Sequence, residues 1–402
     1  EDLFSPTITA QVRVVNTGDS IAKEGSKERQ SIYNGLPLRG GERLSMKILD
    51  QGKTGKGKKK KGLDFTEPET NLIVSSISDV ISQSERETFL LNLVSQEAIT
   101  NETTRVFKKY SSTISTSVEK ILTDERVGFK LDKSRYDIDP TSNEYKFIGN
   151  LKKPFTTLVW LASKSVGDSS KDSTAGFLFY QTQDGFKFKS IEKLTKQSSK
   201  ATYTFTEVNE SSISKNNDFR ILNYTIDRNQ NLLEKLRLGT YSSVRLTFDP
   251  LNFKMKQRIF KFDESGIDKL GNKVVLPRIS EESDKTLSDV PSRLFSQVID
   301  RGTIDADASK KPNADPTKYQ AQTTMRYNLL FTQLLSVTVP CNTDLRAGDI
   351  ITCQFPKVSR EDGERFDEET SGKYIIKELC HHFDPDRSFT SMKLVRDSFG
   401  DA

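Results

Sequence analysis

The sequence of 402 residues contains few of the residue types that build disulfide frameworks, metal sites and acid–base catalytic centres. It has 3 Cys, 2 His and 1 Trp. So small and odd a number of Cys excludes the disulfide scaffold of a secreted protein, and it favours synthesis in a reducing compartment. No window approaches the ~18–20 apolar residues of a membrane span. The richest stretch, Leu329 to Val339, is interrupted by polar side chains, so we expect no membrane partner.

The sequence also lacks a strong charge of either sign. Its 61 Lys and Arg face 56 Asp and Glu, which leaves a net charge of +5. A dedicated nucleic-acid binder concentrates basic charge on one face, so this balance argues against that class. Hydrophobic residues make up only 34% of the chain, which predicts thin domains with much polar surface. The 24 Phe and 11 Tyr still supply bulk for real cores, and the length predicts two to four domains.

Alternation of apolar and polar residues predicts β-strands in the first hundred residues. Successive side chains of a strand point to opposite faces, so apolar residues two apart share a face. The predicted sets are Ile8, Ala10, Val12 and Val14, then Leu44, Met46 and Ile48, then Phe89, Leu91 and Leu93. We therefore assign residues 1–108 to a first β domain.

The apolar period changes to that of helices in residues 109–200, which we predict to form an α+β domain. One helix begins near Ile114, and a second has Pro154 in its first turn. An aromatic hairpin follows, with Asp184-Gly185 at its turn. The predicted apolar positions are Ile114, Val118, Ile121 and Leu122 in the first helix, Phe155, Leu158, Val159, Ala162 and Val166 in the second, and Phe177–Tyr180 with Phe186–Phe188 in the hairpin.

A second β region is divided by a charged excursion. Strand alternation resumes at 222–226 and 244–248, with a short helix from Leu232 that Gly239 ends. Charged residues, Ser, Asp and Pro become frequent in residues 271–316. A predicted helix around 321–330 precedes further strands that continue to Arg396. We assign residues 201–262 and 320–398 to a second β domain, and residues 263–319 to a charged insertion.

Two distant segments of the chain are alike. Leu38–Met46 matches Leu345–Cys353 in residue or residue type at eight of nine places. Each copy continues into a charged loop and then a strand pair, in which Leu91–Val94 aligns with Met392–Val395. We interpret these segments as an internal duplication. The alternative is two unrelated antiparallel sheets that share common turn chemistry.

The run from Gly52 to Lys61 is the most unusual stretch of the sequence. It does not have the Gly-x4-Gly-Lys-Ser/Thr order of a phosphate-binding loop, because Gly52 and Gly57 are five apart and Lys59 occupies the hydroxyl position. We expect Lys-rich residues 53–61 to form an exposed, solvated loop. Contact with a polyanion is the alternative, since Lys is a point charge suited to phosphate.

Cys380-His381-His382 contains all the His of the chain. On a strand, the two His side chains point to opposite faces, and Cys380 and His382 supply only two of the four ligands of structural zinc. No Gly-x-Ser-x-Gly elbow occurs, and acid groups such as Glu361-Asp362 and 367–369 lie in charged loops. We therefore expect no catalytic, cofactor-binding or metal-binding residues, and a protein that is not an enzyme.

Three stretches together resemble the baseplate hub proteins of contractile-tailed bacteriophages. One is the closing pattern Gly348–Ile351, Gly372–Phe383 and Phe389–Leu394, which has the form of a barrel strand, a loop and a hairpin. Another is the helix and aromatic hairpin of Pro154–Leu194, and the third is Phe89–Ser95 followed by the helix at Ile114–Leu122. The resemblance implies a mainly β fold with α+β insertions, in which both β domains are tail-tube-like antiparallel β-barrels. The Lys-rich loop and the charged excursion depart from the family.

The resemblance also implies an assembly. A hub subunit carries two tube-like barrels, so a homotrimer presents six and joins the sixfold tail tube to the threefold central spike. The implied partners are further copies of the chain, the spike or cell-puncturing protein, tail-tube proteins and baseplate wedge proteins, with DNA passing non-specifically through the ring. The implied location is the virion tail baseplate, after synthesis in the host cytoplasm.

Two other function classes compete with this interpretation. A β-sandwich module that binds a surface receptor or a carbohydrate would favour exposed aromatic loops, but the Phe residues mostly alternate in core positions and Trp160 lies in a helix pattern. A β-rich hydrolase lacks a nucleophile with its base. The solution mass discriminates the trimeric hub from both.

Overall fold

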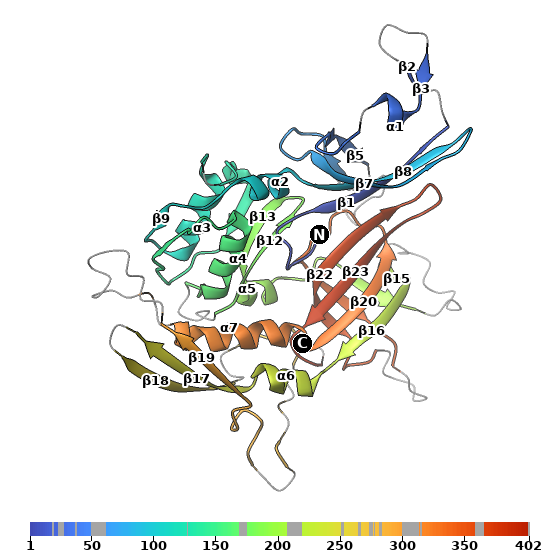
Figure 1. Cartoon of the computed structure of the whole chain (residues 1–402). Helices are drawn as coiled ribbons and strands as arrows, with labels where there is room; N and C mark the ends of the chain where they lie inside the picture. The colour runs from blue at the N-terminus through green and yellow to red at the C-terminus, as the bar shows by residue number, and fades with distance from the viewer. Residues whose placement is uncertain are drawn as a thin grey trace.

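The structure is a computed structural model of the whole chain (Figure 1). It describes residues 1–17, 20–22, 28–36, 38–49, 62–126, 128–168, 175–206, 219–250, 253–263, 267–272, 276, 278–280, 284–299, 313, 316–357 and 366–400. The described strands form two large sheets, a three-stranded sheet within an α+β domain, a separate three-stranded sheet and three two-stranded sheets. The predicted fold class, mainly β with an inserted α+β domain, is confirmed.

The first large sheet contains four antiparallel strands in the order β1-β8-β7-β4. Its buried face follows the predicted alternation, since Phe89, Leu91 and Leu93 pack against Val12 and its neighbours on β1. The short helix α1 and the hairpin β5-β6 complete this core. The bounds are β1 Thr9–Asn16, β2 Ile21–Ala22, β3 Arg29–Gln30, α1 Ile32–Gly35, β4 Arg43–Leu44, β5 Met46–Ile48, β6 Leu63–Phe65, β7 Leu72–Ser82 and β8 Glu87–Ser95.

The second large sheet has seven strands in the order β15-β14-β21-β22-β23-β20-β16, and it curves around its own core (Figure 1). The core includes Leu335, Val337 and Leu394. Strand β14 pairs in parallel with both of its neighbours, so this sheet is mixed rather than wholly antiparallel. The bounds are β14 Thr202–Phe205, β15 Arg220–Ile221, β16 Asn223–Asn229, β20 Gln333–Pro340, β21 Ile350–Gln354, β22 Gly372–Phe383 and β23 Ser388–Arg396.

The predicted duplication is present in the strand pairing of the two large sheets. The order β1-β8-β7-β4 in the first corresponds to β20-β23-β22-β21 in the second, with the same antiparallel pairing at each step. Register also agrees: Leu93 pairs with Ala10 and Val74, and Leu394 pairs with Leu335 and Ile376. Both sheets have a β-bulge directly after this point, between Val74 and Ser76 and between Ile376 and Glu378. Chance turn similarity does not produce a shared bulge and register.

The repeated turn makes the same hydrogen bonds in both copies. Gly41 N–H donates to Val74 O at 2.7 Å, and Gly348 N–H donates to Ile376 O at 2.8 Å. Preceding each glycine, an Arg N–H donates to the acid three residues later: Arg39 to Glu42 and Arg346 to Asp349, both at 2.7 Å. The pattern Leu-Arg-small-Gly-acid therefore specifies a turn that is stabilised by a hydrogen bond within itself and that directly precedes a strand.

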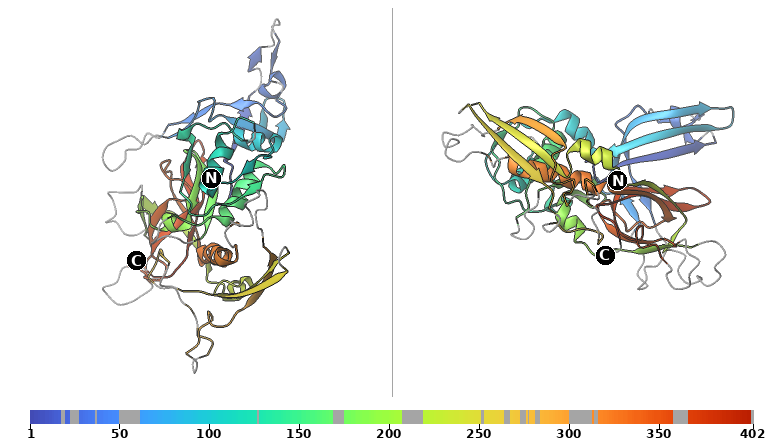
Figure 2. Two further views of the ribbon diagram at one scale, coloured as in Figure 1. Left: turned by 90° about the vertical axis from the view of Figure 1, so that its left-hand side faces the viewer. Right: turned by 90° about the horizontal axis from the view of Figure 1, so that it is seen from below.

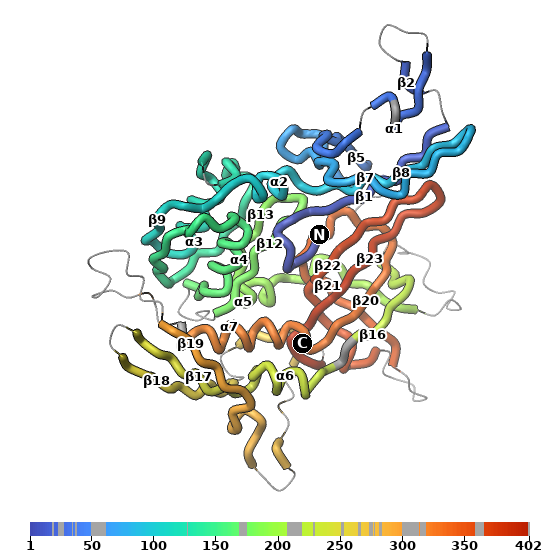
Figure 3. Tube along the Cα trace, viewed as in Figure 1, coloured from blue at the N-terminus to red at the C-terminus, as the bar shows by residue number. Residues whose placement is uncertain are grey.

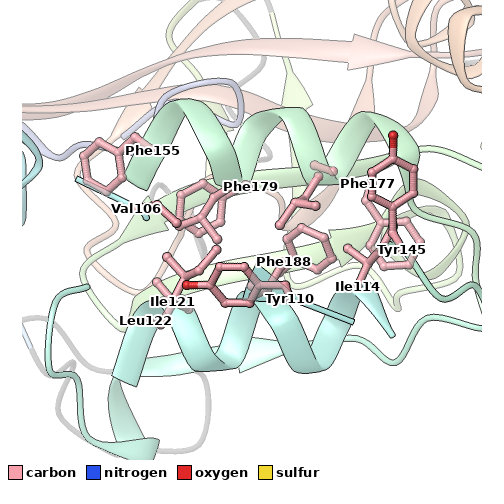
Figure 4. Close-up of a cluster of buried hydrophobic side chains, with 14 of the residues drawn as sticks. Val106, Tyr110, Ile114, Ile121, Leu122, Tyr145, Phe155, Phe177, Phe179 and Phe188 are labelled. Carbon is pink, nitrogen blue, oxygen red and sulfur yellow. The ribbon is translucent and has the colours of Figure 1, made fainter. Parts of the chain in front are cut away.

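The α+β domain lies between the two halves of the duplication and has its own core. Figure 4 shows Ile121 and Leu122 of α3 and Phe155 of α4 around the hairpin residues Phe179 and Phe188. Pro154 is the first residue of α4, as predicted, but Val159 is exposed and Val166 lies beyond the helix end. The bounds are α2 Gln96–Thr103, β9 Lys109–Tyr110, α3 Ile114–Thr123, the 3₁₀ helix Lys133–Arg135, β10 Tyr136–Ile138, β11 Phe147–Ile148, α4 Pro154–Lys164, β12 Phe177–Thr182, β13 Gly185–Ser190 and α5 Ile191–Thr195.

The three-stranded sheet, called the outer sheet below, corrects the predicted division of residues 201–319. Strands β17 (Ser242–Asp249) and β18 (Lys254–Lys261) were assigned to the second β domain, but they pair with β19 (Arg293–Val298) from the charged insertion. Helices α6 (Leu232–Leu238) and α7 (Pro316–Leu330) cover one face of this sheet. A sequence pattern identifies a strand but does not identify its partner, because pairing depends on long-range contacts.

A buried ion cluster joins α7 to the rest of the molecule. The guanidinium of Arg326 lies 2.9 Å from the Glu192 carboxylate of α5 and 3.8 Å from that of Asp397, and all three side chains are at most 3% exposed. Arg326 also donates to the backbone oxygen of Asp268. Since a buried charge is costly without its partner, these groups hold three segments of the chain in one arrangement.

We predict that Arg326→Met lowers the free energy of unfolding by about 3–5 kcal/mol, because Glu192 and Asp397 then remain buried without the guanidinium that lies between them. The measurement is urea denaturation followed by circular dichroism. The control is Lys261→Met, which removes an exposed pair with Asp289 at 3.1 Å and costs at most about 1 kcal/mol. Equal small losses in both variants would contradict a structural role for the cluster.

The two equivalent turn glycines provide a matched pair of substitutions. Gly41 and Gly348 have φ of 96° and 88°, which disfavours any side chain. A Cβ at Gly41 meets nothing within 4 Å, whereas one at Gly348 lies 2.4 Å from the Tyr180 hydroxyl. We expect Gly41→Ala to cost about 1–2 kcal/mol from backbone strain, and Gly348→Ala to cost clearly more. Thermal unfolding measures both, and the reverse order would refute the assigned cause.

Candidate functional site

The candidate site is the face of the duplicated strands that points away from the two cores. We call it the outer polar face. It comprises side chains that alternate with the buried ones on the strands of both copies. Its members are Gln11, Arg13, Ser76, Ser78, Leu90 and Asn92 in the first sheet, and Ser336, Thr338, Glu378, Cys380, Ser391 and Lys393 in the second.

In the first sheet, a row of uncharged side chains crosses the outer polar face. Gln11 Nε2 donates to Asn92 Oδ1 at 2.9 Å, and Asn92 Nδ2 donates to Ser76 Oγ at 3.1 Å. The same amide lies 3.3 Å from Ser78 Oγ. These groups satisfy one another across three strands, so the row carries no net charge.

The equivalent row of the second sheet contains an ion pair instead. Lys393 occupies the position of Asn92, Glu378 that of Ser76, and their Nζ and Oε2 atoms are 2.9 Å apart. The hydrogen bond to Glu378 raises the pKa of Lys393. Burial alone would raise the pKa of Glu378, but hydrogen bonds from Lys377 and Lys393 outweigh it and the net shift is downward. Both groups are therefore charged and balance each other.

The two hairpins that carry this face lie side by side. Figure 1 and the right view of Figure 2 show β7-β8 and β22-β23 extending to the same side of the molecule. The trace in Figure 3 shows the same arrangement of the blue and red segments. The two tips are closed alike, by Gln83 N–H donating to Arg86 O and Asp384 N–H donating to Arg387 O. The two hairpins of the duplicated sheets thus point in the same direction, and the sheets have the same topology.

Cys380, His381 and His382 lie on β22, as the alternation predicted. His381 pairs with Thr390 and has Nδ1 2.9 Å from Thr390 Oγ1, whereas His382 Nε2 lies 2.9 Å from Ser391 Oγ on the other face. The His382 ring also stacks on Phe389. Among the described residues, no group of three or more His, Cys, Asp or Glu could hold a metal ion. The absence of metal and of catalysis in the whole protein stays a prediction.

The remaining predicted features contribute little to the site. The Lys-rich loop 53–61 and Glu361-Asp362 lie outside the described residues. Asp367 is used locally, since its carboxylate accepts from Thr370 Oγ1 and Glu369 N–H. In the part of the chain that the structure describes, no helix is long and apolar enough to cross a membrane. The outer polar face was not predicted from the sequence, although Ser and Asn between core residues in β7 and β8 were a signal for it.

Comparison with known proteins gives one relative by sequence and several by fold. The chain is 22% identical over 305 residues to the probable baseplate hub protein of Vibrio phage KVP40, an alignment that covers 73% of this chain and 67% of that protein. The tail protein from Neisseria meningitidis MC58 has a similar structure, with a TM-score of 0.54, 10% identity, and 99% and 90% of the two chains covered. The 43 kDa tail protein of prophage MuSo2 from Shewanella oneidensis matches with a TM-score of 0.51, 9% identity and coverages of 98% and 91%.

No model of a known protein family matches the sequence. The resemblance to baseplate hub proteins is nevertheless confirmed by the Vibrio phage relative. The two tail-protein structures cover nearly the whole of this chain, which confirms the fold class inferred from the sequence.

Proposed function

We propose that this protein is a non-enzymatic baseplate hub subunit of a phage tail, which forms a homotrimeric ring between the sixfold tail tube and the threefold central spike. The observation that carries the proposal is the duplication, with equal strand order, register, bulge and turn in two sheets. The name of the Vibrio phage relative supports a location in the virion baseplate.

The duplication is what a symmetry mismatch requires. A sixfold tube needs six similar surfaces, and a threefold spike needs three identical ones. Three copies of a chain with two equivalent sheets supply both. The parallel direction of the hairpins supports this, because two units related by rotation about a ring axis have the same direction along that axis (Figure 1).

The outer polar face is suited to the wall of a DNA passage. Each Lys or Arg that contacts a phosphate adds salt-dependent affinity, which would slow transit. The row at Asn92 is neutral and the row at Lys393 is balanced by Glu378, while Arg13 adds one positive charge in the next row of the first sheet. We place this face toward the axis of the ring. The remaining partners in the proposal are tail-tube proteins, the spike or cell-puncturing protein and baseplate wedge proteins, with synthesis in the host cytoplasm.

The first test is the mass in solution. With a chain of 45.5 kDa, we expect native mass spectrometry and sedimentation to give a species of three times that mass. A non-enzymatic surface module with a single binding site has no need of this stoichiometry. A protein that stays monomeric up to about 0.1 mM, alone and with a spike protein, would refute the ring.

The second test concerns the wall. Asn92→Lys adds a positive charge at the place of Lys393 without its acid, and we expect the affinity for duplex DNA to rise about three- to tenfold with a steeper salt dependence. Fluorescence anisotropy over a series of salt concentrations measures both quantities.

The matched control is the double variant Asn92→Lys/Ser76→Glu, which rebuilds in the first sheet the ion pair found in the second. We expect it to return DNA affinity close to that of the unmodified protein. Tight DNA binding by the unmodified protein, or equal affinity in all three proteins, would contradict a non-adhesive wall.

A further inference from the structure

In the second sheet, the segment Glu1–Leu3 covers the edge of β22 beside the repeated turn. Leu3 N–H donates to Lys377 O at 2.7 Å, and Leu379 N–H donates to Glu1 O at 2.9 Å. The segment also forms an antiparallel bridge with β22. It is therefore a short extra strand, placed directly after the residues of β22 that pair with β21.

Ser75 and Ile77 occupy the equivalent positions on β7 of the first sheet. Val74 corresponds to Ile376, and each is followed directly by the β-bulge that the two sheets share. By this register, Ser75 O and Ile77 N–H correspond to the two groups of β22 that bond the segment Glu1–Leu3. They point away from β8, since successive residues of an antiparallel strand direct their backbone groups to opposite sides.

This part of β7 is an open strand edge. Strand β4 pairs with β7 at Leu72 and Ile73, before the bulge. Within the described residues, no other strand pairs with β7 on that side. Ser75 and Ser76 are exposed. We call residues Ser75–Ile77 the open edge of β7. Such an edge presents N–H and C=O groups to which an extended chain can bond.

The space over the repeated turn differs between the two sheets in the same way. A Cβ at Gly348 would lie 3.4 Å from Cδ1 of Leu3, a side chain that is completely buried. A Cβ at Gly41 would have no described atom within 4 Å. The strand edge and the place of the Leu3 side chain are thus both covered in the second sheet and both open in the first.

An acidic side chain also holds the segment in the second sheet. Asp349 accepts a hydrogen bond from Arg346 N–H. The next amide of the turn, that of Ala347, donates to Glu1 Oε2 at 2.9 Å. Glu1 Oε1 accepts from Gln183 N–H at 2.8 Å. The first residue of the segment therefore bonds the repeated turn through its carboxylate.

The first sheet bonds both of these turn amides with its own acid. Glu42 is one methylene longer than Asp349. Its two oxygens accept from Arg39 N–H at 2.7 Å and from Gly40 N–H at 2.9 Å. The hydrogen bond from Arg39 N–H lowers the pKa of Glu42, so this group is a carboxylate at neutral pH. A second carboxylate would find both amides bonded and would be repelled, which favours a neutral residue in the place of Glu1.

The same segment of a second copy does not supply the missing strand. Each chain contains one segment Glu1–Leu3 and holds it against its own second sheet. The duplication therefore gives each chain two equivalent strand edges and only one such segment to cover them.

We propose that the open edge of β7 binds an extended segment of a different protein, with a neutral residue in the place of Glu1 and an apolar residue in the place of Leu3. The backbone of this partner would bond Ser75 O and Ile77 N–H, and its apolar side chain would lie over Gly41. The partner is additional to the contacts of the proposed ring, and the inference does not depend on them.

The probe is a labelled pentapeptide, acetyl-Gln-Asp-Leu-Phe-Ser-amide, which copies residues 1–5 with a neutral first residue. We expect saturable binding to the full-length protein, with a Kd of about 0.1–1 mM by fluorescence anisotropy. A peptide with N-methyl-Leu lacks the N–H that would donate to Ser75 O, and it should bind about tenfold more weakly. The matched control has N-methyl-Asp, whose amide lies on the other side of the strand, and its affinity should be unchanged.

Hydrogen exchange locates the bound peptide. Ile77 N–H should exchange fast in the protein alone and slowly in the presence of the peptide. Leu379 N–H is already bonded to Glu1 O, so it should exchange slowly in both states and serves as the internal control.

Glu42→Asp tests the choice of a neutral first residue. The variant shortens this side chain to that of Asp349, so Gly40 N–H becomes available to a carboxylate of the peptide. We expect the unmodified protein to bind the Gln peptide about three- to tenfold more tightly than its twin with Glu in first place, and Glu42→Asp to prefer the Glu twin. Circular dichroism checks that the variant is folded.

Three results would overturn the proposal. One is the absence of saturable binding at about 1 mM peptide. Another is equal binding of the two N-methylated peptides. The third is slow exchange of Ile77 N–H in the protein alone, since another part of the chain or a second copy would then cover the edge. A monomeric protein that binds the peptide as described would refute the proposed ring and support this inference.

Discussion

Arg326 is the residue at which the main parts of the chain meet. It projects from α7 to Glu192, which ends the α+β domain, and to Asp397, which follows the last strand of the second sheet. The other side of α7 packs through Met325 and Leu329 beneath the outer sheet. A buried guanidinium is stable only while both carboxylates stay in place. The Arg326 cluster therefore helps to fix α7 against the α+β domain and the second sheet, together with the buried apolar cluster that contains Leu178, Leu330 and Ile375.

The duplicated sheets show which features of an ancestral unit a structure keeps. The hydrogen-bonded turn, the strand register and the β-bulge are the same in both copies. The surroundings differ: Gly41 faces open space, whereas Gly348 is in contact with Tyr180 of the α+β domain. The outer polar face differs in the same way, with a neutral row in one copy and an ion pair in the other. Backbone geometry was retained, and side chains adapted to each location.

The outer sheet illustrates how alternation can mislead. Val244, Leu246 and Phe248 alternate with polar residues as core residues do, and this pattern predicts a strand of the second β domain. In the structure, the polar residues between them are buried and Phe248 is exposed. Alternation specifies two faces of opposite polarity. Which face is covered depends on what packs against the strand, and here α6 and α7 cover the polar one.

Local signals in the sequence determined much of the fold. Regular alternation located β1, β8 and β20, the helical period and Pro154 located α4, and Asp184-Gly185 located the hairpin of the α+β domain. The repeat Leu-Arg-small-Gly-acid identified the duplication because its turn is stabilised by bonds within itself and to one neighbouring strand. Only the tertiary structure decided the pairing of β17 with β19, the partners of Arg326, and the cross-strand rows at Asn92 and Lys393. Each of these joins residues far apart in the chain, so no local pattern of propensity or period encodes it.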